Sequence, residues 1–188
     1  MISPEHFAVA TAVAYLLLVI RQNIWCWFFA GLSTLTYIWV TFVAKLYMDT
    51  ALQCFYFAMA VYGWYVWSAG QNDGHKKVVV VWPVSVHVAA LTIIAVVSAA
   101  NGFLLDTRTD AAFPYLDAAT TWAAVWATFL VARKVLVNWW YWLVIDAVYV
   151  FLYWSRDLNW TAVLFVFYIG LIPIGLASWS KSMREQAA

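Results

Sequence analysis

One stripe of polar and aromatic side chains in a very apolar segment has the chemistry to bind a ligand. In NWWYWLVIDAVYVFLYW, which covers residues 138–154, a polar or aromatic residue recurs every three or four positions, which places them on one face of a helix. These residues are Asn138, Trp142, Asp146, Tyr149 and Tyr153. The central carboxyl group could attract a cation, carry a proton, or only hydrogen-bond a neighbouring helix.

A second polar stripe runs through residues 52–67, LQCFYFAMAVYGWYVW, where Gln53, Tyr56 and Trp64 share a helix face. An unpaired amide facing lipid is costly, so we expect Gln53 to face the interior of the protein. It could bind a ligand or join two helices, and Trp64 could belong to an aromatic belt at the membrane interface. Thr121 adds a weaker polar position in a later segment.

The composition shows which class of protein must position these stripes. The chain has 188 residues, of which 66% are hydrophobic and 10% are charged. Soluble domains are roughly half apolar and a quarter charged, so these values indicate an integral membrane protein. Its net charge of +1 argues against nucleic acid as a partner.

Charged and turn residues divide the chain into seven apolar segments, each close to the roughly 20 residues that cross a bilayer as a helix. Because backbone polar groups in lipid must bond internally, and the sequence lacks a barrel-like alternation, we predict an all-α protein with seven transmembrane helices. Their predicted ranges are 5–20, 24–44, 48–68, 78–100, 114–132, 138–155 and 159–180.

An internal repeat organises these helices. Shifting the chain by 112 residues aligns 21–68 with 133–180 without a gap, and the identities include Trp27 with Trp139 and Gly63 with Gly175. We therefore predict two parallel three-helix repeats joined by a linker helix, with the ligand near the midplane where they meet. The predicted domains are 1–68 for the first repeat, 69–110 for the linker helix with its loops, and 111–188 for the second repeat and tail.

Basic residues predict the orientation. Seven lie on the side that carries the C-terminus and three lie on the other side, so the C-terminus is expected in the cytoplasm and the N-terminus outside. The seven are Arg21, Lys76, Lys77, Arg133, Lys134, Lys181 and Arg184, and the three are Lys45, Arg108 and Arg156.

The sequence has no signature of an enzyme, a metal site or a cofactor site. It contains no G-x-S-x-G, no H-E-x-x-H and no phosphate-binding loop. Cys26 and Cys54 lie in apolar stretches and lack metal-ligand spacing. We therefore expect no catalytic residues, no metal and no cofactor.

Three motifs together resemble the PnuC-type vitamin transporters over nearly the whole chain. They are LYMDTALQCFYFAMAVYGWYVW, FPYLDAATTWAAVWATFLVARK and NWWYWLVIDAVYVFLYW, followed by Gly175 and Trp179. The resemblance implies a full-length SWEET-like fold of three, one and three helices, often assembled as homotrimers in a bacterial inner membrane. It also implies facilitated diffusion of an unphosphorylated vitamin, which a cytoplasmic kinase then traps.

The resemblance places the binding site between the third helix and the fifth to seventh helices, with Gln53, Trp64, Asn138, Trp142, Asp146 and Tyr149 on motif positions. The substrate it favours is nicotinamide riboside, a flat cation with hydroxyl groups that these residues suit.

Two departures keep other substrates open. Ala60 and Thr128 stand where many nicotinamide riboside members carry more polar side chains, which favours thiamine somewhat. Riboflavin is carried on another branch. A proton-coupled carrier of an unrelated substrate, or a subunit that does not transport, would also fit the residues.

Overall fold

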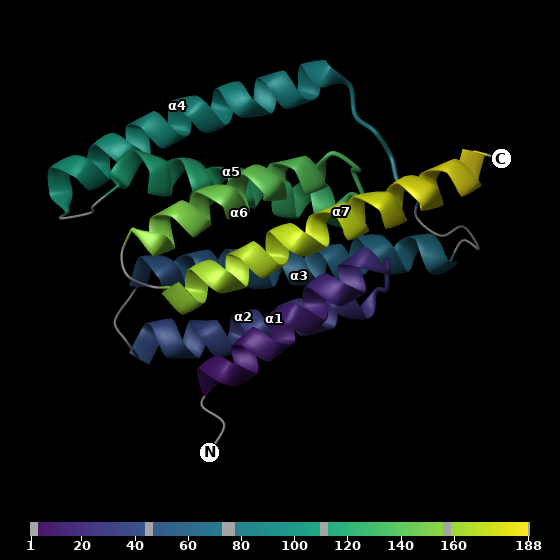
Figure 1. Cartoon of the computed structure of the whole chain (residues 1–188), viewed down its shortest axis with the longest axis horizontal. Helices are drawn as coiled ribbons and strands as arrows, with labels where there is room; N and C mark the ends of the chain where they lie inside the picture. The colour runs from purple at the N-terminus through teal and green to yellow at the C-terminus, as the bar shows by residue number, and fades with distance from the viewer. Residues whose placement is uncertain (1–3, 44–46, 73–77, 110–112, 156–158, 188) are drawn as a thin grey trace. The chain divides into compact units, whose positions relative to one another are not determined.

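The computed structural model describes residues 4–43, 47–72, 78–109, 113–155 and 159–187. These residues form seven helices and no strand (Figure 1), which confirms the predicted all-α class. The helices are α1 (Pro4–Ile20), α2 (Trp25–Val43), α3 (Tyr47–Asn72), α4 (Val84–Arg108), α5 (Pro114–Ala132), α6 (Asn138–Trp154) and α7 (Asn159–Ala187).

Within the described residues, two stretches are long and apolar enough to cross a membrane, judged by length and composition alone. They are α4 and the Ala162–Gln186 part of α7, and Ala10–Ile20 is a shorter apolar stretch. The predicted basic residues Lys45, Lys76, Lys77 and Arg156 lie outside the described residues.

The predicted range of the fourth helix, 78–100, was wrong at both ends. Helix α4 begins after Pro83, whose extended backbone prevents the apolar run before it from joining the helix. Val80 instead pairs with Val135 in an isolated bridge. At the other end α4 continues through Asn101 and Gly102 to Arg108, although these residues resemble a turn in the sequence.

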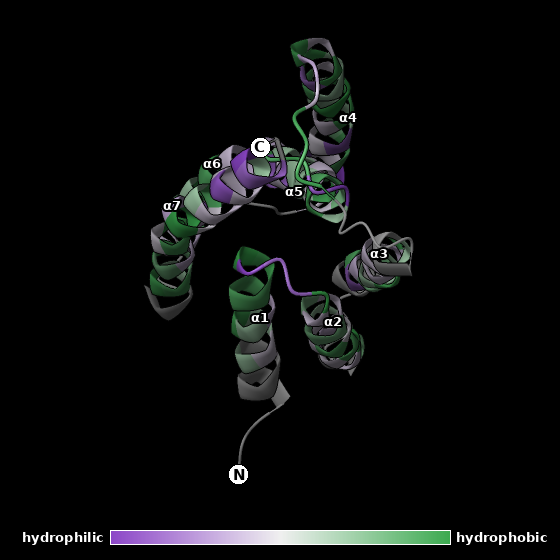
Figure 2. Cartoon of the chain, turned by 90° about the vertical axis from the view of Figure 1, so that its right-hand side faces the viewer, coloured by the Kyte–Doolittle hydropathy of each residue, from purple (hydrophilic) through white to green (hydrophobic). Residues whose placement is uncertain are grey.

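The described chain divides into two compact units. Unit 1 contains residues 1–79, 132–134 and 175–188. Within it α1 packs against α2, and α2 packs against α3. The connection between α1 and α2, residues 21–23, is clearly hydrophilic (Figure 2).

Contacts at one end of unit 1 join four segments. The Trp67 indole donates to the Ala132 carbonyl at 3.0 Å. The Trp179 indole donates to the Val19 carbonyl at 3.0 Å. Lys134 Nζ donates to Gln22 Oε1 at 3.2 Å. Four segments therefore lie at the same end of unit 1, which we call the shared end. They are the turn after α1, the turn after α5, and the late parts of α3 and α7.

Unit 2 contains residues 80–131 and 135–174. Its helix α4 buries only small residues, Ala90, Ser98 and Gly102, and leaves large apolar side chains such as Val84 and Val96 exposed. The Ser98 hydroxyl donates to the Ala118 carbonyl of α5 at 3.4 Å. Small residues on one stripe thus let α4 approach α5 closely, as is common between membrane helices.

This close approach predicts the effect of adding one methyl group. A Cβ at Gly102 would lie 2.9 Å from the Tyr115 backbone Cα, so Gly102→Ala should destabilise the protein by about 1–3 kcal/mol. Gly170 has nothing within 4 Å of such a Cβ, so Gly170→Ala is the matched control and should stabilise α7 slightly. Thermal unfolding in detergent measures both. Equal melting temperatures for the two variants would contradict the packing described.

Candidate functional site

The polar and aromatic stripe of α6 lies on the protected side of that helix. Asn138 is fully buried and Asp146 is 4% exposed, whereas Trp140 and Val144 on the other side are 55% and 64% exposed. Trp142 is half-buried. The helical period found in the sequence therefore separates two faces of α6. One face packs inward in unit 2, and the other face is exposed.

Asp146 occupies the middle of α6, on the buried face of that helix. Within the described parts of the chain, no hydrogen bond or ion pair reaches this side chain. A carboxyl group at the centre of a membrane helix costs about 2.5–3.5 kcal/mol on insertion scales. Both predicted roles of Asp146, a contact to a ligand and a hydrogen bond to a neighbouring helix, therefore stay predictions.

Two aromatic residues of the stripe pack against a buried apolar cluster that includes Ile145, the residue before Asp146. Trp142 and Tyr149 contact a buried cluster of Ala124 and Ala127 from α5 and Ile145 from α6. The small alanine side chains let α5 lie close to α6, and the half-buried rings keep one part of their surface uncovered. Aromatic faces of this kind attract flat cations.

An aromatic cluster extends the stripe toward the end of α6. The ring of Tyr153 stacks on Phe165 of α7 with centroids 5.4 Å apart and planes at 14°. Tyr149 lies 5.0 Å from the same ring, and Tyr168 meets it edge to face. Phe165 was not predicted from the sequence because it is one apolar residue among many in α7. Its position is visible only from the packing of α7 on α6.

Asn138 begins α6 and serves the turn before it. Its Nδ2 donates to the Val135 carbonyl at 2.7 Å, while its buried Oδ1 has no partner among the described residues. One half of the amide is therefore structural and the other half is a spare acceptor. Thr121 of α5 is half-buried.

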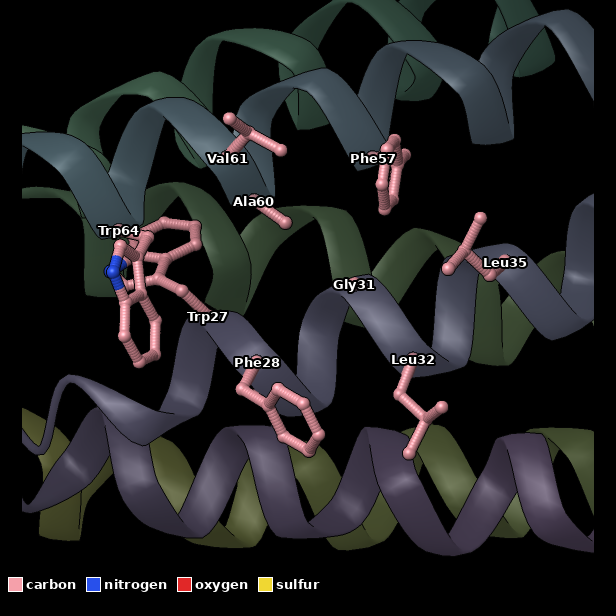
Figure 3. Close-up of a pocket in the computed structure, with 9 residues that line it drawn as sticks. All are labelled: Trp27, Phe28, Gly31, Leu32, Leu35, Phe57, Ala60, Val61 and Trp64. Atoms are coloured by element: carbon pink, nitrogen blue, oxygen red, sulfur yellow. The ribbon is translucent and has the colours of Figure 1, made fainter.

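The predicted residues of α3 belong to unit 1. Gln53 and Tyr56 are half-buried. Trp64 lines a groove of about 390 Å³ between α2 and α3, together with Trp27, Gly31 and others (Figure 3). Only apolar and aromatic side chains line this groove, and neither Gln53 nor Tyr56 is among them. Of these three α3 residues, only Trp64 lines this groove.

The sequence did not predict one polar contact of α4. His87 of α4 lies 3.2 Å from the Tyr141 hydroxyl through its Nδ1, and the two rings are 5.8 Å apart. Tyr141 also packs on the Ala124, Ala127 and Ile145 cluster. Helix α4 is thus joined to the helix that carries the stripe, at the residue before Trp142. A lone histidine has no sequence spacing that could have indicated this.

No group of three or more histidine, cysteine or acidic side chains that could hold a metal occurs in the described ranges. Apolar helices with a buried carboxyl group are typical of integral membrane proteins that carry a functional site within the helix bundle. A family model described as nicotinamide mononucleotide transporter matches residues 3–181. The chain belongs to this family, which confirms the resemblance to PnuC-type transporters.

Curated relatives carry different substrates by name. The chain is 22% identical to the nicotinamide riboside transporter PnuC of Escherichia coli (strain K12), over 86% of this chain and 78% of that protein. It is 27% identical to the riboflavin/roseoflavin transporter RibM of Streptomyces davaonensis, over 89% of this chain and 79% of that protein.

A solved structure supports the fold. The crystal structure of the vitamin B3 transporter PnuC matches with a TM-score of 0.73 and 19% identity, and it covers 97% of this chain and 82% of that one. At this identity the match shows the shared helical fold.

Proposed function

We propose that the chain carries nicotinamide riboside through the bacterial inner membrane by facilitated diffusion, and that a cytoplasmic kinase traps the vitamin. Asp146 carries this proposal, because its buried carboxyl group has no described partner in the middle of a membrane helix. Family membership and the name of the PnuC relative support the substrate class.

The chemistry of the stripe fits a flat cation. The Trp142 ring can stack on a pyridinium, and Asp146 can offset its positive charge. The spare acceptor of Asn138 can receive a hydroxyl group. The other predicted substrate contacts stay predictions: Tyr149, Tyr153 and Thr121 in unit 2, and Gln53, Tyr56 and Trp64 in unit 1.

Thiamine is the second candidate, and one observation favours it. The Thr128 hydroxyl donates to the Ala124 carbonyl of its own helix at 2.8 Å, so it is already engaged. Ala60 offers no polar group. A site with fewer free polar groups suits thiamine, which is also a flat cation, better than it suits nicotinamide riboside, whose ribose carries several hydroxyl groups.

The repeat belongs to the same proposal, with the boundaries 1–68, 69–110 and 111–188 and the SWEET-like order of three, one and three helices. Two equivalent turns support it, because Gln22 and Lys134 are 112 positions apart and both have left-handed backbones, with φ of 52° and 54°. Their following residues make matching bonds at 2.9 Å, from Asn23 N to the Leu18 carbonyl and from Val135 N to the Leu130 carbonyl.

We expect the shared end of unit 1 to face the cytoplasm, with the N-terminus outside. The reason is the excess of basic residues near the turns at 21–23 and 132–134 and near the C-terminus. Green fluorescent protein fused to the C-terminus should fluoresce, and alkaline phosphatase fused there should be inactive. An active phosphatase would reverse the orientation.

Uptake by the purified protein in liposomes tests the function. We expect saturable entry of labelled nicotinamide riboside that stops at equal concentrations, and net accumulation only when a kinase and ATP are enclosed. Collapse of uptake by an uncoupler would instead indicate a proton-coupled carrier. No uptake of any vitamin would favour a subunit that does not transport. Light scattering on the same sample tests the homotrimer that the family implies.

A further inference from the structure

Two equivalent residues of the repeat contact each other at the shared end of unit 1. Gln22 and Lys134 both have a left-handed backbone, which is rare and costly for residues with a Cβ. Their side chains meet, with Lys134 Nζ donating to Gln22 Oε1 at 3.2 Å. If a two-fold axis relates the repeats, equivalent residues that touch must lie close to that axis.

Lys134 is unusually enclosed for a lysine. Its side chain is 6% exposed, and its Nζ lies 4.4 Å from the centroid of the Trp67 ring. Lysine is almost never buried without a partner. Here the amide oxygen of Gln22 and the face of Trp67 both stabilise the ammonium group.

Hydrogen bonds between uncharged groups surround this pair. The Trp67 indole donates to the Ala132 carbonyl, and the Trp179 indole donates to the Val19 carbonyl. The Ser178 hydroxyl donates to the Ile20 carbonyl at 2.8 Å. These carbonyls belong to the last turns of α1 and α5, where helices leave such acceptors free. The third helix of each repeat thus holds the end of the first helix of the other.

We propose that Gln22 and Lys134 form the cytoplasmic gate of the transporter. The gate opens when the Nζ–Oε1 bond breaks and the ammonium group leaves the Trp67 face. The ammonium group is the part that water can solvate once it is released. A flat cationic vitamin can replace it on the Trp67 face, so arrival of the substrate favours opening. This gate rests on the proposed transport function.

The reactivity of Cys26 measures gate opening without any vitamin. Cys26 follows Gln22 by four residues at the start of α2 and is fully buried. With the exposed Cys54 replaced by serine, a water-soluble maleimide should label Cys26 slowly in the closed protein. Lys134→Gln should raise the labelling rate roughly 10-fold or more, because a charge-assisted bond is lost. Gln22→Glu supplies a carboxylate partner and should lower the rate.

The matched control is Lys181→Gln. Lys181 pairs with Glu185 on the surface and its side chain is 74% exposed, so its loss removes the same charge without touching the gate. Its labelling rate should equal that of the parent. A folded Lys134→Gln variant that labels no faster than Lys181→Gln would overturn the proposal.

An exchange of the two residues separates a gate from a general need for lysine at position 134. In the double variant Gln22→Lys with Lys134→Gln, the ammonium group moves to the position that the repeat makes equivalent, and Trp179 is the equivalent of Trp67, with the two rings 6.4 Å apart. We expect slow labelling to return. If Lys134→Gln does not fold, Gln22→Glu decides: a parental labelling rate in that variant rules the gate out. If the labelling rates change as predicted in a protein that binds no vitamin, the gate is supported and the proposed substrate is wrong.

Discussion

Replacing Asp146 with asparagine is expected to weaken binding of a cationic vitamin by roughly 10- to 150-fold, because a charge-assisted contact in an enclosed site is lost. The amide keeps the shape of the side chain and one acceptor oxygen, so the helix should still pack. Isothermal titration of the purified variant measures the loss.

The matched control is Asp106→Asn, since Asp106 is an exposed aspartate of α4. It should bind the vitamin as the parent does, and binding of a neutral flavin to either variant should change little. Unchanged affinity of a folded Asp146→Asn variant for a cationic vitamin that the parent binds would assign Asp146 a structural role.

Removing the ring of Trp142 is expected to have the second largest effect. Trp142→Ala deletes an aromatic face worth about 1–3 kcal/mol in stacking on a flat ring, which corresponds to a loss of roughly 5- to 150-fold in affinity. Trp142→Phe keeps an aromatic face and should retain most of the binding.

Trp140 provides the control on the same helix, because it lies two residues earlier on the exposed side of α6. Trp140→Ala should bind as the parent does. If Trp140→Ala and Trp142→Ala lose affinity equally, the loss reflects damage to α6 rather than stacking on the ligand.

The sequence predicted the stripe of α6 well because a helical period depends only on the order of residues. Asn138 and Asp146 are buried where that period places them, and Trp140 is exposed. The predicted range of the fifth helix, 114–132, is also confirmed, because Pro114 suits the first turn of a helix.

Features that depend on a neighbouring helix could not be predicted. Asn101 and Gly102 resemble a turn, but Gly102 is required because Tyr115 of α5 lies against it. The stacking of Tyr153 on Phe165 depends on how α6 and α7 are rotated against each other. The repeat in the sequence predicts that Gln22 and Lys134 are equivalent. Only the folded structure shows that their side chains are in contact.

The most direct test of the proposed function is a calorimetric titration of the detergent-purified protein with nicotinamide riboside, thiamine and riboflavin in turn. We expect saturable binding of nicotinamide riboside, with thiamine as the alternative, and an affinity for the bound cation that falls at least 10-fold in Asp146→Asn. Saturable binding of riboflavin together with no binding of either cation would contradict the account.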